Sequence, residues 1–234
     1  MPTGPEDAAL VTRSDPRTTP AYSVSDAARY LRIPAPTIRS WAFGRQYPTR
    51  KGSGHFPPVV TVPDKRQHLL SFVNLIELSA LRALRTEHAF KLSAVREALG
   101  YAKRELRVDD LLASKDLYAK PGALFLAHYG HLINLNRAGQ LGIKAVLNGL
   151  LTRIRFDRGQ AVRFFPVVPS RADAQTVMLD PKVSFGRPVL VSCGVTTSAI
   201  VDRINAGEEP RALATDYGTT EAEIMDALAY ERAA

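Results

Sequence analysis

The chain has 234 residues, of which 45% are hydrophobic, and its formal net charge is +8. The single cysteine, Cys193, excludes an internal disulfide and is typical of a cytoplasmic protein, where we expect it to be an inert buried thiol. No apolar run is long enough to span a bilayer or to form a signal peptide, so a membrane partner is not expected.

Residues 1–20 carry four prolines among polar side chains and almost no apolar residue that could be buried. A segment of this composition cannot offset the entropy lost when a chain becomes ordered. We therefore expect a disordered arm over residues 1–20, with ordered structure beginning at Tyr22.

A first helix is predicted to end near Leu31. Ser23 and Asp26 have the spacing of a capping box, in which each side chain bonds to the backbone of the other residue. Apolar residues then recur at helical spacing up to Leu31.

A tight turn over residues 33–36 leads into a second short helix that should end near Phe43. Pro36 suits the first position of this helix, because its missing N–H would have no partner inside the helix there. We expect two side chains to be buried and three to be exposed, namely Ile38 and Trp41, and Thr37, Arg39 and Ser40.

Cations concentrate in this helix-turn-helix and after it. Residues 29–66 contain eight Lys and Arg against the single acid Asp64, which indicates a surface for nucleic-acid phosphates. A short helix fits the major groove, where an arginine can bond to a guanine edge, so Arg39 is the predicted base reader.

The glycine-containing turn at residues 50–54, which leads into an extended segment at residues 59–62, predicts a wing. A solvated basic loop on a helical bundle is the alternative. The predicted DNA-binding residues are Thr37, Arg39, Ser40, Arg45, Arg50 and Lys51.

The same stretch resembles the winged helix-turn-helix of the MerR type. Residues 22–28 look like the first helix of that motif and residues 35–41 like its second. Residues 72–78 and 92–99 are similar to the helix pair that follows the wing. In MerR-type proteins a long coiled coil for dimerisation comes next, whereas this chain departs from that pattern. We expect the DNA-binding domain to cover residues 21–110.

Residues 111–176 are predicted to form a small α+β module. Two hairpins are expected, over residues 125–135 and residues 153–165, with a helix from Arg137 to Leu151 between them. His128 and His131 have a spacing that metal ligands use, but no acid or thiol lies nearby in sequence, so we expect a structural or surface role and no metal.

The central module is also basic. Three interpretations remain open: these cations extend the DNA-binding surface, contact an acidic protein, or are solvated side chains on strand faces. The cations are Arg137, Lys144, Arg153, Arg155, Arg158 and Arg163, against Asp157.

Residues 177–234 are predicted to form a three-helix, helix-turn-helix-like bundle. The expected helices run from Thr197 to Ala206, from Pro210 to Asp216 and from Thr220 to about Glu231, with glycines closing the first two and a capping box opening the third. The predicted core consists of Ile200, Ile204, Leu213, Tyr217, Ile224 and Leu228. The third helix carries Glu221, Glu223, Asp226 and Glu231. Phosphates disfavour these charges, so we expect this helix to contact protein and its carboxylates to be solvated.

This tail resembles a compact three-helix family of unknown function that is described as VapB-type antitoxins. The similarity lies in residues 186–188, 203–208, 214–218 and 223–224. The chain from Tyr22 onward looks like the large VapB-like antitoxins that have an added N-terminal DNA-binding domain. The fold class is thus expected to be mainly α with a small α+β centre.

The resemblance implies a DNA-binding antitoxin of a type II toxin-antitoxin system. Such a protein neutralises a PIN-domain ribonuclease toxin by direct binding, represses its own operon at operator DNA, and works without a cofactor. PIN-type nucleases hold a divalent cation with clustered carboxylates, and an arginine placed among them would compete with the metal. Arg187, between a glycine and a proline, is the predicted toxin-binding residue, with Arg153 and Arg155 as further donors.

Other functions are also compatible with the sequence. The first is a MerR-like transcription regulator that senses a small ligand in the central module, and the second is a purely structural dimerisation protein. No catalytic constellation is found, so we do not expect an enzyme. A homodimer is expected, because helix-turn-helix proteins usually read paired half-sites.

Overall fold

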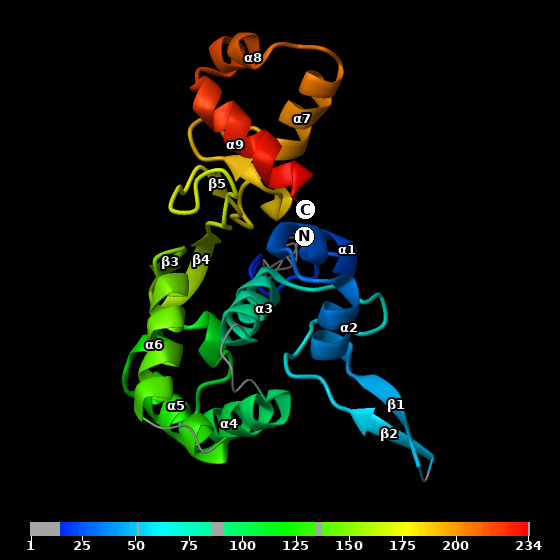
Figure 1. Ribbon diagram of the computed structural model, residues 1–234, viewed down its shortest axis with the longest axis vertical. Helices are drawn as coiled ribbons and strands as arrows, with labels where there is room; N and C mark the ends of the chain where they lie inside the picture. Colours follow the sequence, from blue (N-terminus) through cyan, green and yellow to red (C-terminus); the bar gives the residue numbers. More distant parts are fainter. Residues whose placement is uncertain (1–14, 51, 86–90, 134–136, 234) are drawn as a thin grey trace, which may run out of the picture.

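The computed structural model describes residues 15–50, 52–85, 91–133 and 137–233 (Figure 1). Its helices are α1 (Val24–Leu31), α2 (Ala35–Phe43), α3 (Phe72–Arg85), α4 (Leu92–Glu105), α5 (Lys120–Leu132), α6 (Arg137–Leu151), α7 (Thr197–Asn205), α8 (Pro210–Tyr217) and α9 (Glu221–Arg232). Its strands form three antiparallel pairs, β1 (Arg45–Thr49) with β2 (Gly52–Phe56), β3 (Ile154–Asp157) with β4 (Gln160–Phe164), and β5 (Val177–Met178) with β6 (Val189–Leu190). The expected class, mainly α with a small α+β centre, is confirmed. Among the described residues, no helix has the length and apolar character needed to cross a membrane.

The capping box that opens α1 is present. The Ser23 hydroxyl accepts a hydrogen bond from the Asp26 N–H at 3.0 Å, and the Asp26 carboxylate accepts one from the Ser23 N–H at 3.2 Å. The helix ends at Arg32, whose φ of 52° is left-handed. Helix α2 begins one residue earlier than predicted, so Pro36 occupies its second position. That position also lacks an intrahelical N–H partner.

The predicted wing is a hairpin, and residues 59–62, which were predicted to be extended, lie outside it. Strand β1 pairs with β2, Arg45 opposite Phe56, and not with residues 59–62. The N–H groups of Val59 and Val60 instead donate to the Trp41 carbonyl, at 2.7 and 3.3 Å. Residues 59–62 therefore cross the end of α2, with Val60 buried at 4% exposure.

The hairpin predicted at residues 125–135 is wrong, because this segment lies mostly in helix α5. Phe125 and Tyr129 are four residues apart and both are buried, so the apolar pattern that suggested a strand also suits one face of a helix. His128 stacks on Tyr101, with ring centroids 4.4 Å apart. Within the described ranges, no group of His, Cys and acidic side chains could hold a metal. The second predicted hairpin (β3–β4) and the Arg137–Leu151 helix are confirmed.

Part of the predicted disordered arm is ordered. Arg17 forms an ion pair with Asp15 at 2.5 Å, and the Arg17 carbonyl accepts a hydrogen bond from the Val73 N–H at 3.1 Å. The first residues described are thus held against the start of α3. The rest of that prediction, residues 1–14, lies outside the described residues.

Two main apolar clusters hold the protein together. The larger joins α1 to α6 and β4, and includes Ile38, Trp41 and Leu75. The second is built around the predicted tail core, with Ile200, Leu213 and Ile224 fully buried, and Ile204 and Tyr217 half-buried against it; Leu228 is buried as well. Cys193 is only partly buried at the edge of this cluster. The domain boundaries at 110 and 176 stay predictions.

The tail contacts the helix-turn-helix directly, and Figure 1 shows the end of α9 beside α1. The Tyr230 hydroxyl donates to the Tyr30 carbonyl at 3.0 Å, and Glu231 pairs with Arg29 at 3.4 Å. In the opposite direction, a hydroxyl of the N-terminal part donates to the tail: the Tyr22 hydroxyl donates to the Gly186 carbonyl at 3.3 Å. Residues about 200 positions apart in sequence therefore share one interface.

Candidate nucleic-acid interface and partner surface

The predicted DNA-binding side chains lie on α2 and on the hairpin that follows it. Arg39, Arg45 and Arg50 are exposed, while Thr37 and Ser40 are half-buried. Among the described residues, none of these arginines forms an ion pair with a carboxylate, so their charge is available to a polyanion. Lys51, also in the predicted set, lies outside the described residues.

A hollow of about 430 Å³, lined by both polar and apolar side chains, lies between α2, the hairpin and the end of α3. It brings together Thr37, Ser40 and Arg45 from the predicted set, and adds Arg85 from the last turn of α3. Arg39 and Arg50 do not line it. The hollow could receive a phosphate group while Arg39, exposed on the same helix, faces solvent.

An aromatic ring in contact with two guanidinium groups anchors the base of the hairpin. Arg45 and Arg96 approach the Phe56 ring at 5.9 and 4.9 Å from its centroid. Arg96 also donates to the Pro57 carbonyl at 2.8 Å. Gly44 has a φ of 77°, and a Cβ there would stand 2.5 Å from the Phe56 carbonyl oxygen, so only glycine allows this close approach. Figure 1 shows the hairpin projecting from the body beyond this anchored base.

Sequence reasoning missed Arg85 and Arg96. Arg85 follows the basic segment by nineteen residues and Arg96 lies on α4, so neither belongs to the local run of cations that indicated DNA binding. Only the packing of α3 and α4 against α2 and the hairpin brings these two arginines to the interface. The position of Arg85 in the last turn of α3 was the only sequence feature that set this residue apart.

The predicted toxin-binding residue Arg187 is exposed and follows an unusual turn. Ser184, Phe185 and Gly186 have φ values of 47°, 56° and 76°, all left-handed. For a bulky non-glycine residue this conformation costs about 1–2 kcal/mol. A Cβ at Gly186 would overlap the Tyr22 hydroxyl. The turn is therefore in close contact with Tyr22, just before α1. Phe185, in contrast, is 90% exposed. The left-handed backbone at an exposed aromatic makes Phe185 a candidate binding residue, which sequence reasoning missed.

The other two predicted toxin contacts differ from Arg187. Arg153 is half-buried and donates to the carbonyls of Phe165 and Pro166, each at 3.4 Å, and burial lowers its pKa. Arg155 is exposed, stacks on Phe165 at 5.2 Å and donates to Gln175 at 3.1 Å. Arg153 thus holds its own chain together, whereas Arg155 is accessible.

The central cations also divide by environment. Arg163 pairs with Asp180 at 3.1 Å, while Lys144 and Arg158 are exposed. The side chain of Arg137 lies outside what the structure describes. Exposed cations therefore remain on the central module, and they could contact either DNA or an acidic protein.

The prediction that the acids of α9 are solvated is wrong for two of them. Asp226 is 2% exposed; it pairs with Arg171 and accepts hydrogen bonds from Ser170 and Thr176 at 2.8 and 2.9 Å. Burial acts to raise the pKa of Asp226, but these bonds outweigh it, and the pKa is lowered. Glu231 is held by Arg29. These two carboxylates hold the fold together, so α9 presents fewer free acids to solvent than its sequence suggests.

These observations define a class of protein. A helix-turn-helix with a wing carries exposed cations, and a three-helix unit is attached to it by direct contacts. Comparison with known proteins agrees with this description. Residues 20–99 match a family described as "Putative DNA-binding HTH domain". Residues 177–230 match one described as "Protein of unknown function (DUF433)".

Whole-chain relatives come from Mycobacterium tuberculosis. The chain is 27% identical to "Putative antitoxin VapB45" over 226 residues, which cover 89% of this chain and 92% of that protein. It is 24% identical to the uncharacterized protein Rv2308, with 90% of each covered. The crystal structure of Rv2018 matches with a TM-score of 0.67 at 24% identity, over 90% of this chain and 98% of that one. The chain is thus similar, over nearly its whole length, to a protein described as a "Putative antitoxin", and its residues 20–99 match a helix-turn-helix family described as DNA-binding. The similarity in fold to the Rv2018 structure covers 90% of the chain.

Proposed function

We propose that this protein is a DNA-binding antitoxin of a type II toxin-antitoxin system, without enzymatic activity. In this proposal it neutralises a PIN-domain ribonuclease, and as a homodimer with a MerR-like wing it represses its own operon. The exposed arginines on α2 and the hairpin, which have no carboxylate partner among the described residues, carry the DNA part of the proposal. Similarity to a protein described as an antitoxin supports the toxin part.

The DNA part can be tested at two positions with different roles. Arg39→Ala should weaken binding to the upstream region of the protein's own gene by about 1–3 kcal/mol and relax the preference at one base pair. Arg50→Ala should weaken binding to all sequences alike and reduce the slope of log affinity against log salt by about one.

Gel-shift titrations at several salt concentrations measure both effects. Arg104→Ala, on the exposed face of α4, removes the same charge away from α2 and the hairpin and is the matched control. If Arg39→Ala behaves like Arg104→Ala, α2 is not the recognition helix.

The toxin part centres on Phe185 and Arg187. We propose that the exposed ring enters an apolar pocket of the nuclease, while Arg187 reaches the carboxylates that hold its catalytic cation. Buried aromatic and arginine anchors of this kind often dominate an interface. Arg187→Ala should then restore ribonuclease activity while the complex still co-elutes.

Phe185→Ala should weaken the complex itself by about 2 kcal/mol or more, the usual loss at a hot spot. Arg211→Ala, exposed on α8, is the control. Full inhibition by the Arg187→Ala protein would remove Arg187 from the proposal. Failure to isolate any complex with the neighbouring gene's product would contradict the antitoxin function altogether.

A cleft between α1, α3 and α6 favours a second candidate, a transcription regulator that senses a small ligand. The two candidates differ in their partners. The antitoxin should co-purify with a nuclease encoded beside its gene, and the regulator should not. Co-expression of the two genes followed by affinity purification separates them.

A further inference from the structure

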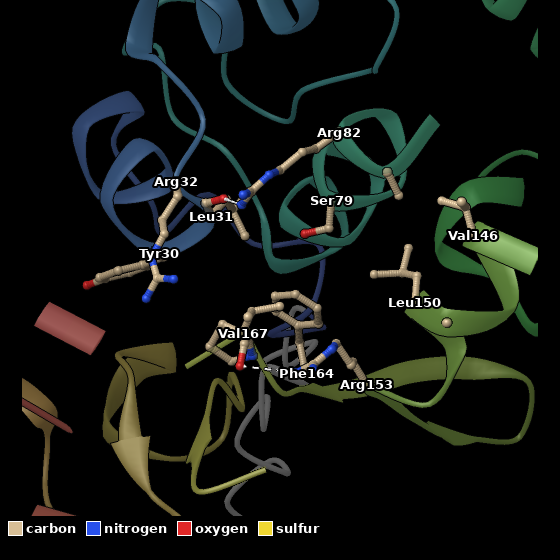
Figure 2. A pocket seen from close by; sticks show the side chains of 13 residues that line it. Tyr30, Leu31, Arg32, Ser79, Arg82, Val146, Leu150, Arg153, Phe164 and Val167 are labelled. Atoms are coloured by element: carbon tan, nitrogen blue, oxygen red, sulfur yellow. Dashed lines mark hydrogen bonds between the residues drawn. The ribbon is translucent and has the colours of Figure 1, made fainter. Parts of the chain in front are cut away.

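A cleft of about 260 Å³ lies where the helix-turn-helix meets the central module (Figure 2). Its walls come from α1, α3, α6, β4 and the segment after β4, and they are mostly apolar. The main apolar side chains are Leu31, Val146, Leu150, Phe164 and Val167. No residue that lines this cleft also lines the hollow beside α2, so the two are separate sites.

Three arginines surround the cleft, and Figure 2 shows them on different sides of it: Arg32 at the end of α1, Arg82 on α3, and Arg153 just before β3. Among the described residues, none of the three forms an ion pair with a carboxylate. Arg82 donates to the Leu31 carbonyl, and Arg153 donates to the carbonyls of Phe165, Pro166 and Ala172. These carbonyls carry no net charge to balance the three cations.

Arg32 is the least satisfied of the three. Its Nε is buried and has no hydrogen-bond partner among the described residues. Its Nη2 makes one long bond of 3.5 Å to the Tyr230 carbonyl, and its guanidinium lies 5.4 Å from the centroid of the Tyr230 ring. Burial lowers the pKa of Arg32; Tyr230 opposes this shift, and the positive charge of Arg82 adds to it. Burial lowers the pKa of Arg153 also, with Asp173 acting weakly in the opposite direction. A desolvated cation without a counter-charge is costly, and a bound anion would relieve that cost.

Gly149 lines the cleft. It lies inside α6, where glycine costs about 1 kcal/mol relative to alanine. Neither backbone nor packing requires it, because its φ is not left-handed and a Cβ would find no atom within 4 Å. Gly130, in contrast, is packed against Gln140. Position 149 is exposed and borders open space at the cleft, so a larger side chain can be accommodated there.

We propose that this cleft binds a small amphipathic carboxylate, with its charged end between Arg32 and Arg153 and its apolar body against Leu150 and Phe164. A carboxylate suits the donors that remain, since several N–H groups of these arginines are already used by carbonyls and two oxygens need few partners. The volume is below the range of about 300–1,000 Å³ that holds drug-sized molecules, so the ligand is correspondingly small. The inference does not depend on the proposed function.

The test uses octanoate as the probe and the uncharged 1-octanol as its control, titrated calorimetrically into the full-length protein. Octanoate should bind with one site per chain, and octanol at least tenfold more weakly. Arg32→Gln and Arg153→Gln should each weaken octanoate binding at least tenfold. Arg104→Gln, with the same loss of charge on the exposed face of α4, should leave it unchanged.

Arg32 and Arg153 also form hydrogen bonds to backbone carbonyls, so replacing either could unfold the protein. A further variant therefore tests the cleft without removing these bonds. Gly149→Leu introduces a better helix former into open space, so the protein should remain at least as stable to heat, while the side chain fills the cleft and abolishes octanoate binding. Absence of octanoate binding to the natural protein, equal binding of octanol, or unchanged binding by the Gly149→Leu protein would each overturn the proposal.

Discussion

Glu77 should make the protein less stable as the pH rises through neutrality. Its side chain is buried in α3, where Oε2 accepts one hydrogen bond, from Asn74 Nδ2 at 2.8 Å. No described cation pairs with it. Burial raises the pKa of Glu77 to about 8; the Asn74 bond opposes this rise and the charge of Asp110 adds to it. The carboxyl group is therefore protonated in the folded protein at neutral pH.

The direction and the size of this change in the free energy of unfolding follow from proton linkage. Above its ordinary value of 4.5, the unfolded chain releases the Glu77 proton, whereas the folded chain keeps it up to about pH 8. The free energy of unfolding thus falls between these values, by about 1.4 kcal/mol per pH unit, and this contribution is constant outside them. At pH 7 the accumulated loss is about 3 kcal/mol as an upper limit. Glu77→Gln is neutral at every pH and retains an acceptor for Asn74, so it should recover this amount.

Urea unfolding of both proteins at a series of pH values provides the measurement. The Glu77→Gln protein should match the natural one near pH 4.5 and become progressively more stable toward pH 8. Glu97→Gln, on the exposed face of α4, is the control and should show no such divergence. A stability difference that is constant with pH, or that favours the natural protein as the pH rises, would refute the argument from burial.

Three further substitutions test the contacts that hold the parts together. Asp226→Asn should lower the free energy of unfolding by about 2 kcal/mol, because the charged partner Arg171 loses its counter-ion; urea unfolding that gives no loss would contradict this role. Tyr230→Phe removes the hydroxyl that bonds to the backbone of α1 and should cost about 1 kcal/mol in the same assay, with an unchanged midpoint arguing against the contact. Gly44→Ala should displace the hairpin, since the new Cβ would stand 2.5 Å from the Phe56 carbonyl, and should reduce DNA affinity in a gel shift; unaltered affinity would mean that the hairpin does not contact DNA.

Local signals were sufficient for much of the secondary structure. The Ser23–Asp26 capping box opens α1, and a second one places the start of α9 at Thr220. Helix α6 has the predicted bounds Arg137–Leu151, and the tail helices differ from expectation by about a residue at their ends. Caps, prolines and glycines act on the backbone within one turn of their own position, so the sequence states them directly.

The predictions that failed depended on distant partners. The apolar residues Phe125 and Tyr129 fit a strand or a helix equally by spacing, and packing within the larger apolar cluster selected the helix. Residues 59–62 were predicted only to be extended, and their place beside α2 is set by the N–H groups of Val59 and Val60, which donate to the Trp41 carbonyl. In both segments the deciding contacts form only in the folded chain.

The sequence by itself determined the helical class, the cationic helix-turn-helix and the three-helix tail, because each of these follows from residues close together in the chain. Only the tertiary structure decided which charges are free. It buried Asp226 in an ion pair with Arg171, and it buried Glu77 with no described cation beside it, which raises the pKa of Glu77. It also gathered Arg32, Arg82 and Arg153 around one cleft. Electrostatic environment depends on burial and on distances between side chains remote in sequence, and those quantities exist only once the helices have packed.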